Sequence, residues 1–448
     1  MGKELFGTDG IRGVAGRYPL DEPTVYAFGL ALGDDVRALA ADGDAEVLIG
    51  ADTRESAGWL AETVAGGLAH RGVRVRYAGV ITTPGVAWLT RTGPFAAGVV
   101  ISASHNPYQD NGLKVFGHSG FKLPDADEDA IEQEILSLVK GGLEPQRLTL
   151  SVDESLDRQY LEYLLSTVGT RFEGTRLAVD CGNGASYKLA PELFRRLGAE
   201  VSAMATEPDG RNINLGCGAL HVEGLARKVV AEGAHFGVAF DGDADRAIFV
   251  SSSGTVVNGD GVLLAAGRAM KAAGRLPGDT VVSTVMSNLG LEKALQRAGI
   301  RMTRTQVGDK YVLEEMERIG ARLGGEQSGH VIFREYATTG DGMLTALRLF
   351  ELAVRSGQGL DELTSDLSVY PQKLINIRVR EKRPFDGMPL VAQEIRSVER
   401  DLDAEGRVLV RYSGTELLAR VMVEAADHQR VESGAGRIAD AIRKEIGA

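Results

Sequence analysis

The sequence predicts an α/β protein with three related α/β domains in series and a smaller α+β domain at the C-terminus, arranged around a central cleft. Its 448 residues are too many for one hydrophobic core, since domains typically hold about 100 to 150 residues. A strand–helix–strand pattern occurs three times in the first three quarters of the chain, and the remainder follows a different order.

The repeated pattern begins with an apolar run, continues through a polar or Gly-rich loop into a helix-like stretch, and ends in a second strand. The copies lie at 46–79, 176–204 and 280–306. In each copy a glycine stands where the helix should end and the next strand begin: Gly72, Gly198 and Gly299. This spacing predicts parallel strands joined by right-handed crossovers.

The C-terminal part reads as a small α+β domain. Its expected strands cover 374–380, 407–414 and 419–427, and its expected helices cover 389–402 and 429–446. Charged or turn-rich stretches near 141–152, 251–261 and 366–373 are the expected joints. They divide the chain into domains at 1–150, 151–255, 256–370 and 371–448. Clefts between domains are common ligand sites, so four domains in a row can surround one substrate.

The charge and cysteine content of the chain restrict the kinds of molecule it can bind. With 50 Lys and Arg against 62 Asp and Glu, the net charge is −12, which argues against nucleic acid. Cys181 and Cys217 form neither a metal-ligand spacing nor a disulfide framework. No apolar stretch approaches the roughly 18 residues that span a bilayer, and no signal peptide opens the chain. We therefore expect a cytoplasmic protein without a membrane partner.

The first loop with chemical potential is ISASHNPYQDNGLKVFG at 101–117. It follows an apolar strand and contains a Pro and an Asn-Gly turn, so we expect Ser102, Ser104 and His105 on an exposed loop. A serine at a strand end can be a nucleophile if it is activated. The G-x-S-x-G pattern of acyl hydrolases is absent. A turn that only stabilises the loop is the alternative.

The second loop is VAFDGDADRAIFV at 238–250. Small residues separate Asp241, Asp243 and Asp245, which lets three carboxylates converge on one hard cation such as Mg²⁺. Arg246 and Ser252 stand where an EF-hand requires Gly and Glu, which excludes that calcium loop. A solvated acidic turn is the alternative. Because apolar strands flank the turn, three like charges there would be costly without a cation.

Two further loops present polar groups. LGGEQSGHVIF at 323–333 offers Glu326 and Ser328 for neutral hydroxyls and His330 as an acid or base near pH 7. RYSGTELLAR at 411–420 combines arginine, hydroxyls and backbone N–H groups in a pattern that can hold a phosphate dianion. Its expected ligands are Arg411, Ser413, Gly414, Thr415 and Arg420. Either loop alone could equally be structural.

Together the four loops indicate phosphoryl transfer without nucleotide machinery. No G-x-x-x-x-G-K-[ST] occurs, which excludes a P-loop kinase. CGNGASY at 181–187 resembles the start of a dinucleotide fingerprint, but Tyr187 stands where the third glycine belongs. A Rossmann oxidoreductase is therefore a poor alternative.

The motifs resemble those of the α-D-phosphohexomutase family over essentially the whole chain. Five of them occur in the family's order and rough spacing: FGTDGIRG (6–13), the SHNP loop, DGDADR (241–246), GEQSGH (325–330) and RYSGTE (411–416). NINLGCGALH (212–221), VGDKYVLEEM (307–316) and the Gln of GEQSGH are most similar to the branch that acts on glucosamine phosphates. One departure is Leu417, where the family usually has Pro.

The resemblance implies a role for each matching residue. Ser104 would be the phosphorylated serine, next to His105 in the catalytic loop, and would share a Mg²⁺ ion with the three aspartates. Arg12, Lys114 and Arg246 would hold the transferred phosphoryl group, and His330 would be a general base. Glu326 and Ser328 would bind sugar hydroxyls, and the 411–420 loop would bind the distal phosphate.

The implied activity is the interconversion of glucosamine 6-phosphate and glucosamine 1-phosphate, which would feed UDP-N-acetylglucosamine and cell-wall precursor synthesis. Phospho-Ser104 would pass through a 1,6-bisphosphate, with glucosamine or glucose 1,6-bisphosphate as activator. Alternatives are a phosphoglucomutase or phosphomannomutase of the same family, a metal-dependent sugar phosphatase, and a silent phosphosugar-binding protein. A homodimer is compatible with this assignment, and the sequence leaves the oligomeric state open.

Overall fold

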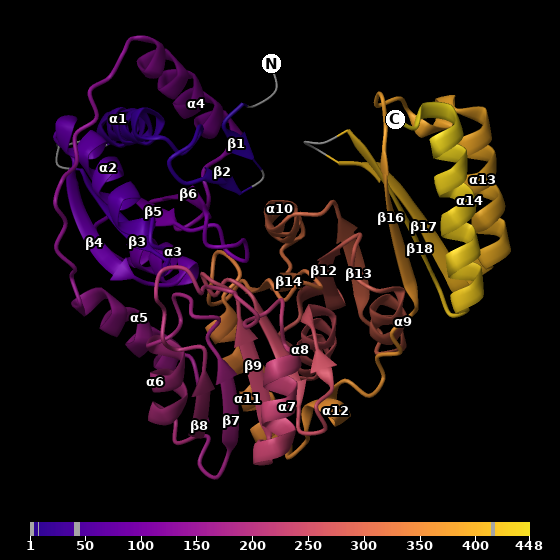
Figure 1. The fold of residues 1–448 in the computed structure, drawn as a ribbon. Helices are drawn as coiled ribbons and strands as arrows, with labels where there is room; N and C mark the ends of the chain where they lie inside the picture. The colour runs from indigo at the N-terminus through magenta and orange to yellow at the C-terminus, as the bar shows by residue number, and fades with distance from the viewer. Residues whose placement is uncertain (1–3, 8, 40–44, 414–416) are drawn as a thin grey trace.

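The computed structural model describes residues 4–7, 9–39, 45–413 and 417–448. Its chain runs through three sheet-containing lobes and a separate C-terminal lobe, coloured from indigo to yellow in Figure 1. None of the helices in the described ranges is long and apolar enough to cross a membrane.

The N-terminal lobe contains a six-stranded sheet in the order β1-β2-β6-β5-β3-β4. The apolar residues of one sheet face pack with those of α1, α2 and α4, while α3 lies against the other face. The elements are β1 (Phe6–Gly7), β2 (Gly10–Val14), α1 (Glu22–Leu39), β3 (Glu46–Ala51), α2 (Ala57–His70), β4 (Arg74–Val80), α3 (Thr83–Thr92), β5 (Ala97–Ile101), β6 (Asp110–Gly117) and α4 (Asp125–Lys140).

The second lobe has a five-stranded sheet, β11-β10-β9-β7-β8, and the third a four-stranded sheet, β13-β12-β14-β15. Second-lobe elements are α5 (Ser155–Ser166), β7 (Arg176–Asp180), α6 (Leu189–Arg196), β8 (Glu200–Met204), α7 (Glu223–Glu232), β9 (Phe236–Phe240), β10 (Ala247–Ser251) and β11 (Val256–Val257). Third-lobe elements are α8 (Gly259–Ala272), β12 (Thr280–Thr284), α9 (Leu289–Arg297), β13 (Arg301–Thr305), α10 (Asp309–Ile319), β14 (Leu323–Gly325), β15 (Val331–Phe333), α11 (Gly342–Ser356) and α12 (Leu360–Leu363).

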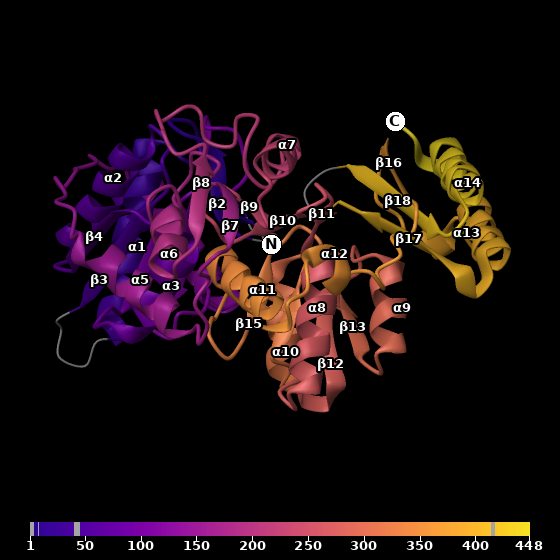
Figure 2. The ribbon, with the colours of Figure 1, turned by 90° about the horizontal axis from the view of Figure 1, so that it is seen from below.

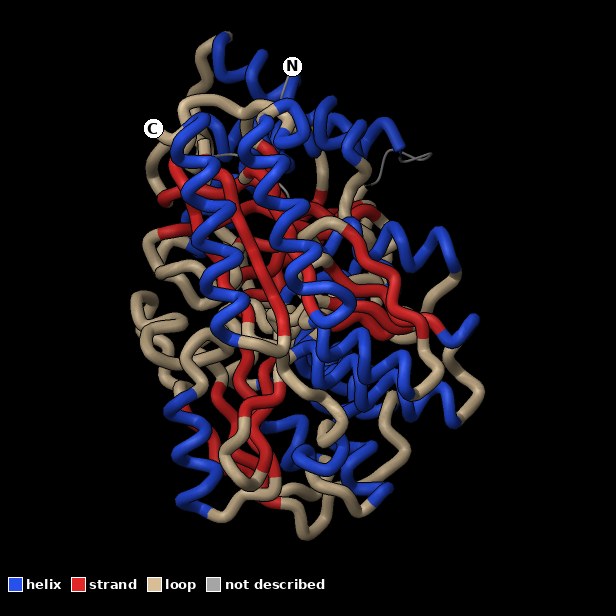
Figure 3. Tube along the Cα trace, turned by 90° about the vertical axis from the view of Figure 1, so that its right-hand side faces the viewer, coloured by secondary structure: helices blue, strands red, loops and turns tan. Residues whose placement is uncertain are grey.

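The C-terminal lobe, which we call domain IV, is a three-stranded antiparallel sheet in the order β16-β18-β17. Its elements are β16 (Gln372–Arg378), α13 (Pro389–Leu402), β17 (Gly406–Tyr412), β18 (Leu418–Ala425) and α14 (His428–Ile446). Figure 3 faces this lobe and shows its two helices side by side in front of the sheet. The predicted α+β tail is confirmed, with element ends shifted by a few residues.

The predicted three-fold repeat is also confirmed. The strands of each copy pair in parallel, as β3 with β4, β7 with β8 and β12 with β13. Each helix-to-strand glycine has a positive φ, between 68° and 96°, a conformation that glycine adopts without strain. The sheets are nevertheless mixed, because in each lobe a third parallel strand turns back as an antiparallel hairpin: β5–β6, β9–β10 and β14–β15.

The hairpins share one position in the repeat, since the strand order (hairpin partner, third strand, first strand, second strand) is the same in all three sheets. The loops at 102–109, 241–246 and 326–330 join the two strands of each hairpin. Three loops that are far apart in sequence therefore come from equivalent places in three sheets.

The hydrophobic core of domain IV is separate, whereas the other three lobes share one. One apolar cluster extends from the first lobe through the second and into the third, including Val86, Phe194 and Phe350. Domain IV has a separate core built from residues between Ile377 and Ile446. Figure 2, from below, shows the same division, with domain IV standing to one side of the other lobes.

Candidate active site

Ser104 lies in the β5–β6 loop and faces the second lobe. Its hydroxyl donates to Asp241 Oδ2 at 2.6 Å, and its backbone has a φ of 53°. A non-glycine residue in this region is uncommon, and such strain persists where the surroundings fix it, often at functional sites. The geometry directs the serine hydroxyl at the carboxylates of the neighbouring loop.

The expected exposure is wrong for the two serines, because Ser102 and Ser104 are 0% and 1% exposed, whereas His105 is half-buried and Pro107 and Gln109 are exposed. The cause is Arg54, whose buried guanidinium donates to the carbonyl oxygens of Ser104 (2.9 Å) and Asn106 (2.9 Å). Asp52 holds that guanidinium at 2.8 Å and also accepts from Ser102. A buried arginine satisfies the carbonyls that would otherwise face water.

The three aspartates occupy the β9–β10 loop and are all buried. Each offers an oxygen that lies within 4.8 Å of those of the other two. Asp243 Oδ1 and Asp245 Oδ1 accept no hydrogen bond from any residue within the described ranges. Burial, then Asp245 and Asp243, raises the pKa of Asp241 well above its ordinary value. Buried carboxylates with unused oxygens fit a hard divalent cation such as Mg²⁺.

Lys114 on β6 supplies a fixed positive charge at the edge of the triad. Its Nζ lies 2.9 Å from Asp243 Oδ2 and 3.0 Å from Asp9 Oδ2. Burial alone would lower the pKa of Lys114, but Asp243, Asp9 and Asp245 raise it well above its ordinary value. Thr83, at the start of α3, donates to the same Asp243 oxygen at 2.7 Å. Lys114 is therefore a permanent cation.

His105 follows Ser104 in the β5–β6 loop and meets Arg246, which lies in the facing β9–β10 loop. Arg246 Nη1 lies 3.0 Å from His105 Nδ1, and Ser104 Oγ lies 3.3 Å from the same nitrogen. Burial, then Arg246 and Arg12, lowers the pKa of His105 to about 4. The imidazole is neutral near pH 7, so its Nδ1 can accept from Arg246.

His330 ends the β14–β15 loop and is buried between two carboxylates. Its Nε2 accepts from the backbone N–H of Gly340 at 3.0 Å, so Nδ1 carries the proton in the neutral ring. Nδ1 lies 3.6 Å from Asp245 and Nε2 lies 3.7 Å from Asp309. Burial would lower the pKa of His330, but Asp245, Asp309 and Glu326 together raise it.

A cavity of about 570 Å³ lies beside this centre and is bordered by Asp245, Arg246 and His330, whereas Ser104 is not among its lining residues. Its volume suits a hexose phosphate. Arg12, Asp245, Arg246, Glu326 and His330 line it, together with Asp9, Gly308 and Asp309. Glu326 also accepts from the Gly308 N–H at 3.2 Å. Ser328 lies on the same loop with an exposed side chain.

Domain IV presents two arginines from neighbouring strands. Arg411 on β17 is directly opposite Arg420 on β18, and burial, then Arg420, lowers the pKa of Arg411. Like charges placed opposite each other are unfavourable without an anion. Ser413 is buried beside them and donates its N–H to Leu418 at 2.8 Å. The predicted ligands Gly414 and Thr415 lie outside the described residues.

The sequence analysis missed several residues of this centre. Asp9 pairs with Arg12 at 2.5 Å and with Lys122 at 2.5 Å. Lys122 also reaches Asp309 at 2.5 Å, which links the first and third lobes. Asp9 stands inside the FGTDGIRG motif, so the motif could have identified it. No local signal marks Lys122, because its partners are distant in sequence.

Family models for all four domains match the chain. They are described as phosphoglucomutase/phosphomannomutase, with α/β/α domain I over 3–140, domain II over 158–254, domain III over 258–370 and the C-terminal domain over 374–441. The chain therefore belongs to the phosphoglucomutase/phosphomannomutase family. The predicted membership of the α-D-phosphohexomutases, and with it a mutase activity, is confirmed.

The curated relatives narrow the family further. The chain is 70% identical over 447 residues to the phosphoglucosamine mutase of Solibacter usitatus, with 100% of both chains covered. It is 52% identical to the phosphoglucosamine mutase of Koribacter versatilis, covering 99% of this chain and 98% of the relative. The relatives thus point to the phosphoglucosamine branch that the sequence motifs indicated.

Solved structures support the fold. A phosphoglucomutase/phosphomannomutase family protein from Burkholderia thailandensis superposes with a TM-score of 0.79 at 24% identity, covering 98% of this chain and 99% of that one. N-acetylphosphoglucosamine mutase from Aspergillus fumigatus, in complex with GlcNAc-6P and magnesium, gives a TM-score of 0.65 at 18% identity, covering 99% and 96%.

Proposed function

We propose that the chain interconverts glucosamine 6-phosphate and glucosamine 1-phosphate through a phosphoserine at Ser104 and a 1,6-bisphosphate intermediate. The names of its relatives support the substrate. The observation that carries the mechanism is the buried Ser104 hydroxyl, 2.6 Å from a carboxylate of the aspartate triad. A phosphoryl group on that oxygen would meet the triad, Lys114 and Arg246 at once.

The first transfer moves the phosphoryl group from Ser104 to the free hydroxyl of the sugar phosphate. A Mg²⁺ ion held by Asp241, Asp243 and Asp245 would neutralise charge on the transferring group. Fixed positive charge comes in addition from Lys114, Arg12 and Arg246. Stabilising the negative charge of the transferring group is the main source of catalysis in phosphoryl transfer. The second transfer returns the other phosphoryl group to Ser104.

We assign proton transfer to His330. It lines the cavity and lies beside Asp245 and Asp309. His105 is a poorer candidate, because its pKa is lowered to about 4 and Arg246 lies at its Nδ1. His105 instead sets the orientation of Arg246 beside Ser104.

The distal phosphate would bind to domain IV through Arg411, Ser413 and Arg420, together with Gly414 and Thr415 of the same loop. Glucosamine or glucose 1,6-bisphosphate would activate the enzyme by phosphorylating Ser104. Because either phosphate of the bisphosphate must fit here, the ligands should rely on charge and not on a particular sugar face.

Sugar choice depends on groups other than Glu326 and Ser328, since those would read hydroxyls common to glucose, mannose and glucosamine. The segments Asn212–His221 and Gly308–Lys310 are our candidates. Gly308 and Asp309 line the cavity, so the second segment has the stronger case. A hydroxyl can replace an amine as donor and acceptor, so we expect a preference and not exclusion.

The decisive experiment compares kcat/KM for glucosamine, glucose and mannose phosphates at fixed Mg²⁺ and glucose 1,6-bisphosphate. We expect glucosamine 6-phosphate to lead, with residual glucose phosphate turnover. A higher value for glucose or mannose phosphate would overturn the substrate assignment and leave the mutase chemistry standing. Free phosphate is measured in parallel, because its accumulation would indicate a sugar phosphatase.

Three further predictions complete the proposal. The product would feed UDP-N-acetylglucosamine and cell-wall precursor synthesis, the enzyme would be cytoplasmic, and a homodimer, which is compatible with the assignment, is the assembly to test. Light scattering on the purified chain tests the last of these, and a monomer mass over the working concentration range would refute it.

A further inference from the structure

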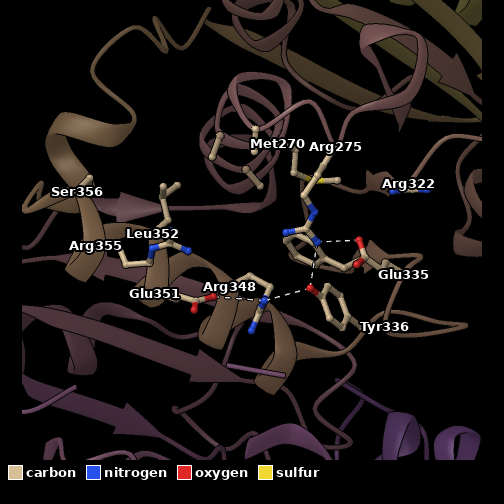
Figure 4. Close-up of a pocket in the computed structure, with 14 residues that line it drawn as sticks. Met270, Arg275, Arg322, Glu335, Tyr336, Arg348, Glu351, Leu352, Arg355 and Ser356 are labelled. Atoms are coloured by element: carbon tan, nitrogen blue, oxygen red, sulfur yellow. Dashed lines mark hydrogen bonds and ion pairs between the residues drawn. The ribbon is translucent and has the colours of Figure 1, made fainter. Parts of the chain in front are cut away.

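A second cavity lies on the third lobe, between α8, α11 and the segment after β15, and is lined by none of the catalytic candidates (Figure 4). Its volume of about 370 Å³ falls within the range of small-molecule sites. Ala266 and Ala269 of α8 and Ala273, which caps this helix, border it at spacings of three and four residues. Because alanine side chains do not fill the space, an apolar hollow remains, which Met270 and Leu352 border.

The rim of this cavity is basic in a chain whose net charge is −12. Arg275, Arg322, Arg348 and Arg355 line it, against only Glu335 and Glu351. Arg275 is paired with Glu335 at 2.7 Å and also reaches the Tyr336 hydroxyl at 3.0 Å. Arg348 lies 3.3 Å from Glu351 and stacks its guanidinium over the Tyr336 ring at 4.8 Å. Figure 4 draws these five side chains, Arg275, Glu335, Tyr336, Arg348 and Glu351, with the contacts between them as dashed lines.

The rim holds one buried nitrogen donor without an acceptor and two arginines that face solvent. Within the described ranges, the exposed side chains of Arg322 and Arg355 form no hydrogen bond or ion pair with another residue. Arg348 Nε is buried and donates to no described residue. A buried N–H without an acceptor is costly, and each such group in a folded protein calls for an explanation. Figure 4 shows the Arg355 side chain directed toward the middle of the cavity, beside Leu352.

We propose that this cavity binds a small amphipathic anion, with an apolar body over the alanines of α8 and a phosphate, sulfonate or carboxylate among Arg322, Arg348 and Arg355. The apolar floor accounts for the body of the ligand. The solvent-facing guanidinium groups of Arg322 and Arg355 account for the charged group, which arginine binds through paired N–H bonds. The proposal is independent of the sugar on which the enzyme acts.

The probe for this site is 8-anilinonaphthalene-1-sulfonate, which carries both features, added to the full-length enzyme in Mg²⁺. We expect one saturable fluorescent site. Ala269→Trp, which fills the floor, should remove it, and Arg355→Glu should weaken it about tenfold or more, as loss of a charged hydrogen bond does. Arg400→Glu is the control, since Arg400 is also an exposed arginine in the last turn of a helix. Turnover close to wild type in all three variants verifies their folding.

A displacement experiment shows whether the cavity prefers an amphipathic anion to an anion without an apolar part. Phenyl phosphate should displace the probe, while inorganic phosphate at equal ionic strength should not. Probe binding that is unchanged in Ala269→Trp and Arg355→Glu would overturn the proposal. Equal displacement by inorganic phosphate would overturn it too, because the apolar floor would then contribute nothing.

Discussion

The Ser104 centre and the phosphate-binding edge of domain IV both handle phosphate, but they are built differently. Around Ser104, three carboxylates and Lys114 are almost fully buried. Asp241 lies 2.6 Å from the Ser104 hydroxyl and Asp243 lies 2.9 Å from Lys114. At the edge of domain IV, Arg411 and Arg420 are half-buried and oppose each other. One centre is a buried set of opposite charges, and the other places two like charges on neighbouring strands.

The packing beneath the two regions differs in the same way. The hairpin loops of the Ser104 centre rest on one apolar core that runs through three lobes, whereas domain IV has its own. Domain IV is joined to the third lobe by polar contacts, such as Arg407 to the carbonyls of Val285 (2.8 Å) and Ser287 (2.6 Å). Catalysis of phosphoryl transfer needs charges that are already in place. A site that binds either phosphate of a bisphosphate can instead tolerate small movements of its ligands. The predictions below test that division.

The largest effect should come from Ser104→Ala. Without the hydroxyl there is no phosphoserine, and turnover should fall at least about 10⁴-fold, as for other lost nucleophiles. Peptide mass spectrometry of the wild type should place the phosphate on Ser104. Ser102→Ala is the comparison: Ser102 bonds Asp52 and accepts the Ser104 N–H, so its loss should disturb the loop and lower turnover much less than loss of the nucleophile. An obligatory phosphate on Ser102 would refute the assignment.

The next largest effect should come from the triad. Asp243→Ala removes an oxygen ligand and leaves Lys114 and Thr83 without their shared partner. Turnover in Mg²⁺ should fall about 10³-fold, and Asp241→Ala and Asp245→Ala should behave alike. Circular dichroism checks that the fold is kept. EDTA should inactivate the wild type reversibly, and a chelated enzyme that keeps its rate would disprove the metal role.

Much of the scaffold could be predicted because it depends on local pattern. The apolar runs, together with the glycine between helix and strand, predicted each strand–helix–strand copy. The spacing of the three aspartates predicted that their carboxylates lie together. The hairpins that carry the functional loops were not predicted. A short antiparallel return strand such as β15 spans three residues, too few to show a period.

The resemblance placed Ser104 and the three aspartates around one Mg²⁺ ion, but residue patterns alone could not predict contacts between loops, because these join residues more than a hundred positions apart. Ser104 and Asp241 are 137 residues apart, and Lys122 and Asp309 are 187 apart. The burial of Ser104 depends on Arg54, which lies in a different loop from the motif it covers. Such pairings are set by how the lobes pack, and one sequence carries no local trace of them.

A smaller effect is expected at the edge of domain IV. Arg411→Ala should raise KM about 10- to 100-fold, which corresponds to the loss of a charge-assisted hydrogen bond. The value of kcat should change only a few-fold, because the distal phosphate is held equally before and after transfer. Arg400→Ala, on the outer helix of the same domain, is the control. A kcat loss comparable to that of Asp243→Ala would show that domain IV takes part in the chemistry and would end the distinction drawn here.

The smallest effect concerns Asp260, a buried carboxylate outside the Ser104 centre. Its Oδ2 accepts from the Asn288 N–H at 2.8 Å, and burial raises its pKa to about 6, against the pull of the Asn288 and Ser287 hydrogen bonds. Between the unfolded pKa of 3.8 and about 6, the folded chain binds more protons than the unfolded chain. This group therefore makes stability fall as pH rises through that window.

Asp260→Asn keeps the acceptor and removes the ionisation. At pH 7.5 it should raise the thermal midpoint by a few degrees, at pH 4.5 it should change it little, and turnover should stay close to wild type. A lower midpoint at pH 7.5 would mean that the ionised carboxylate is stabilised where it lies, as the triad carboxylates would be by their cation.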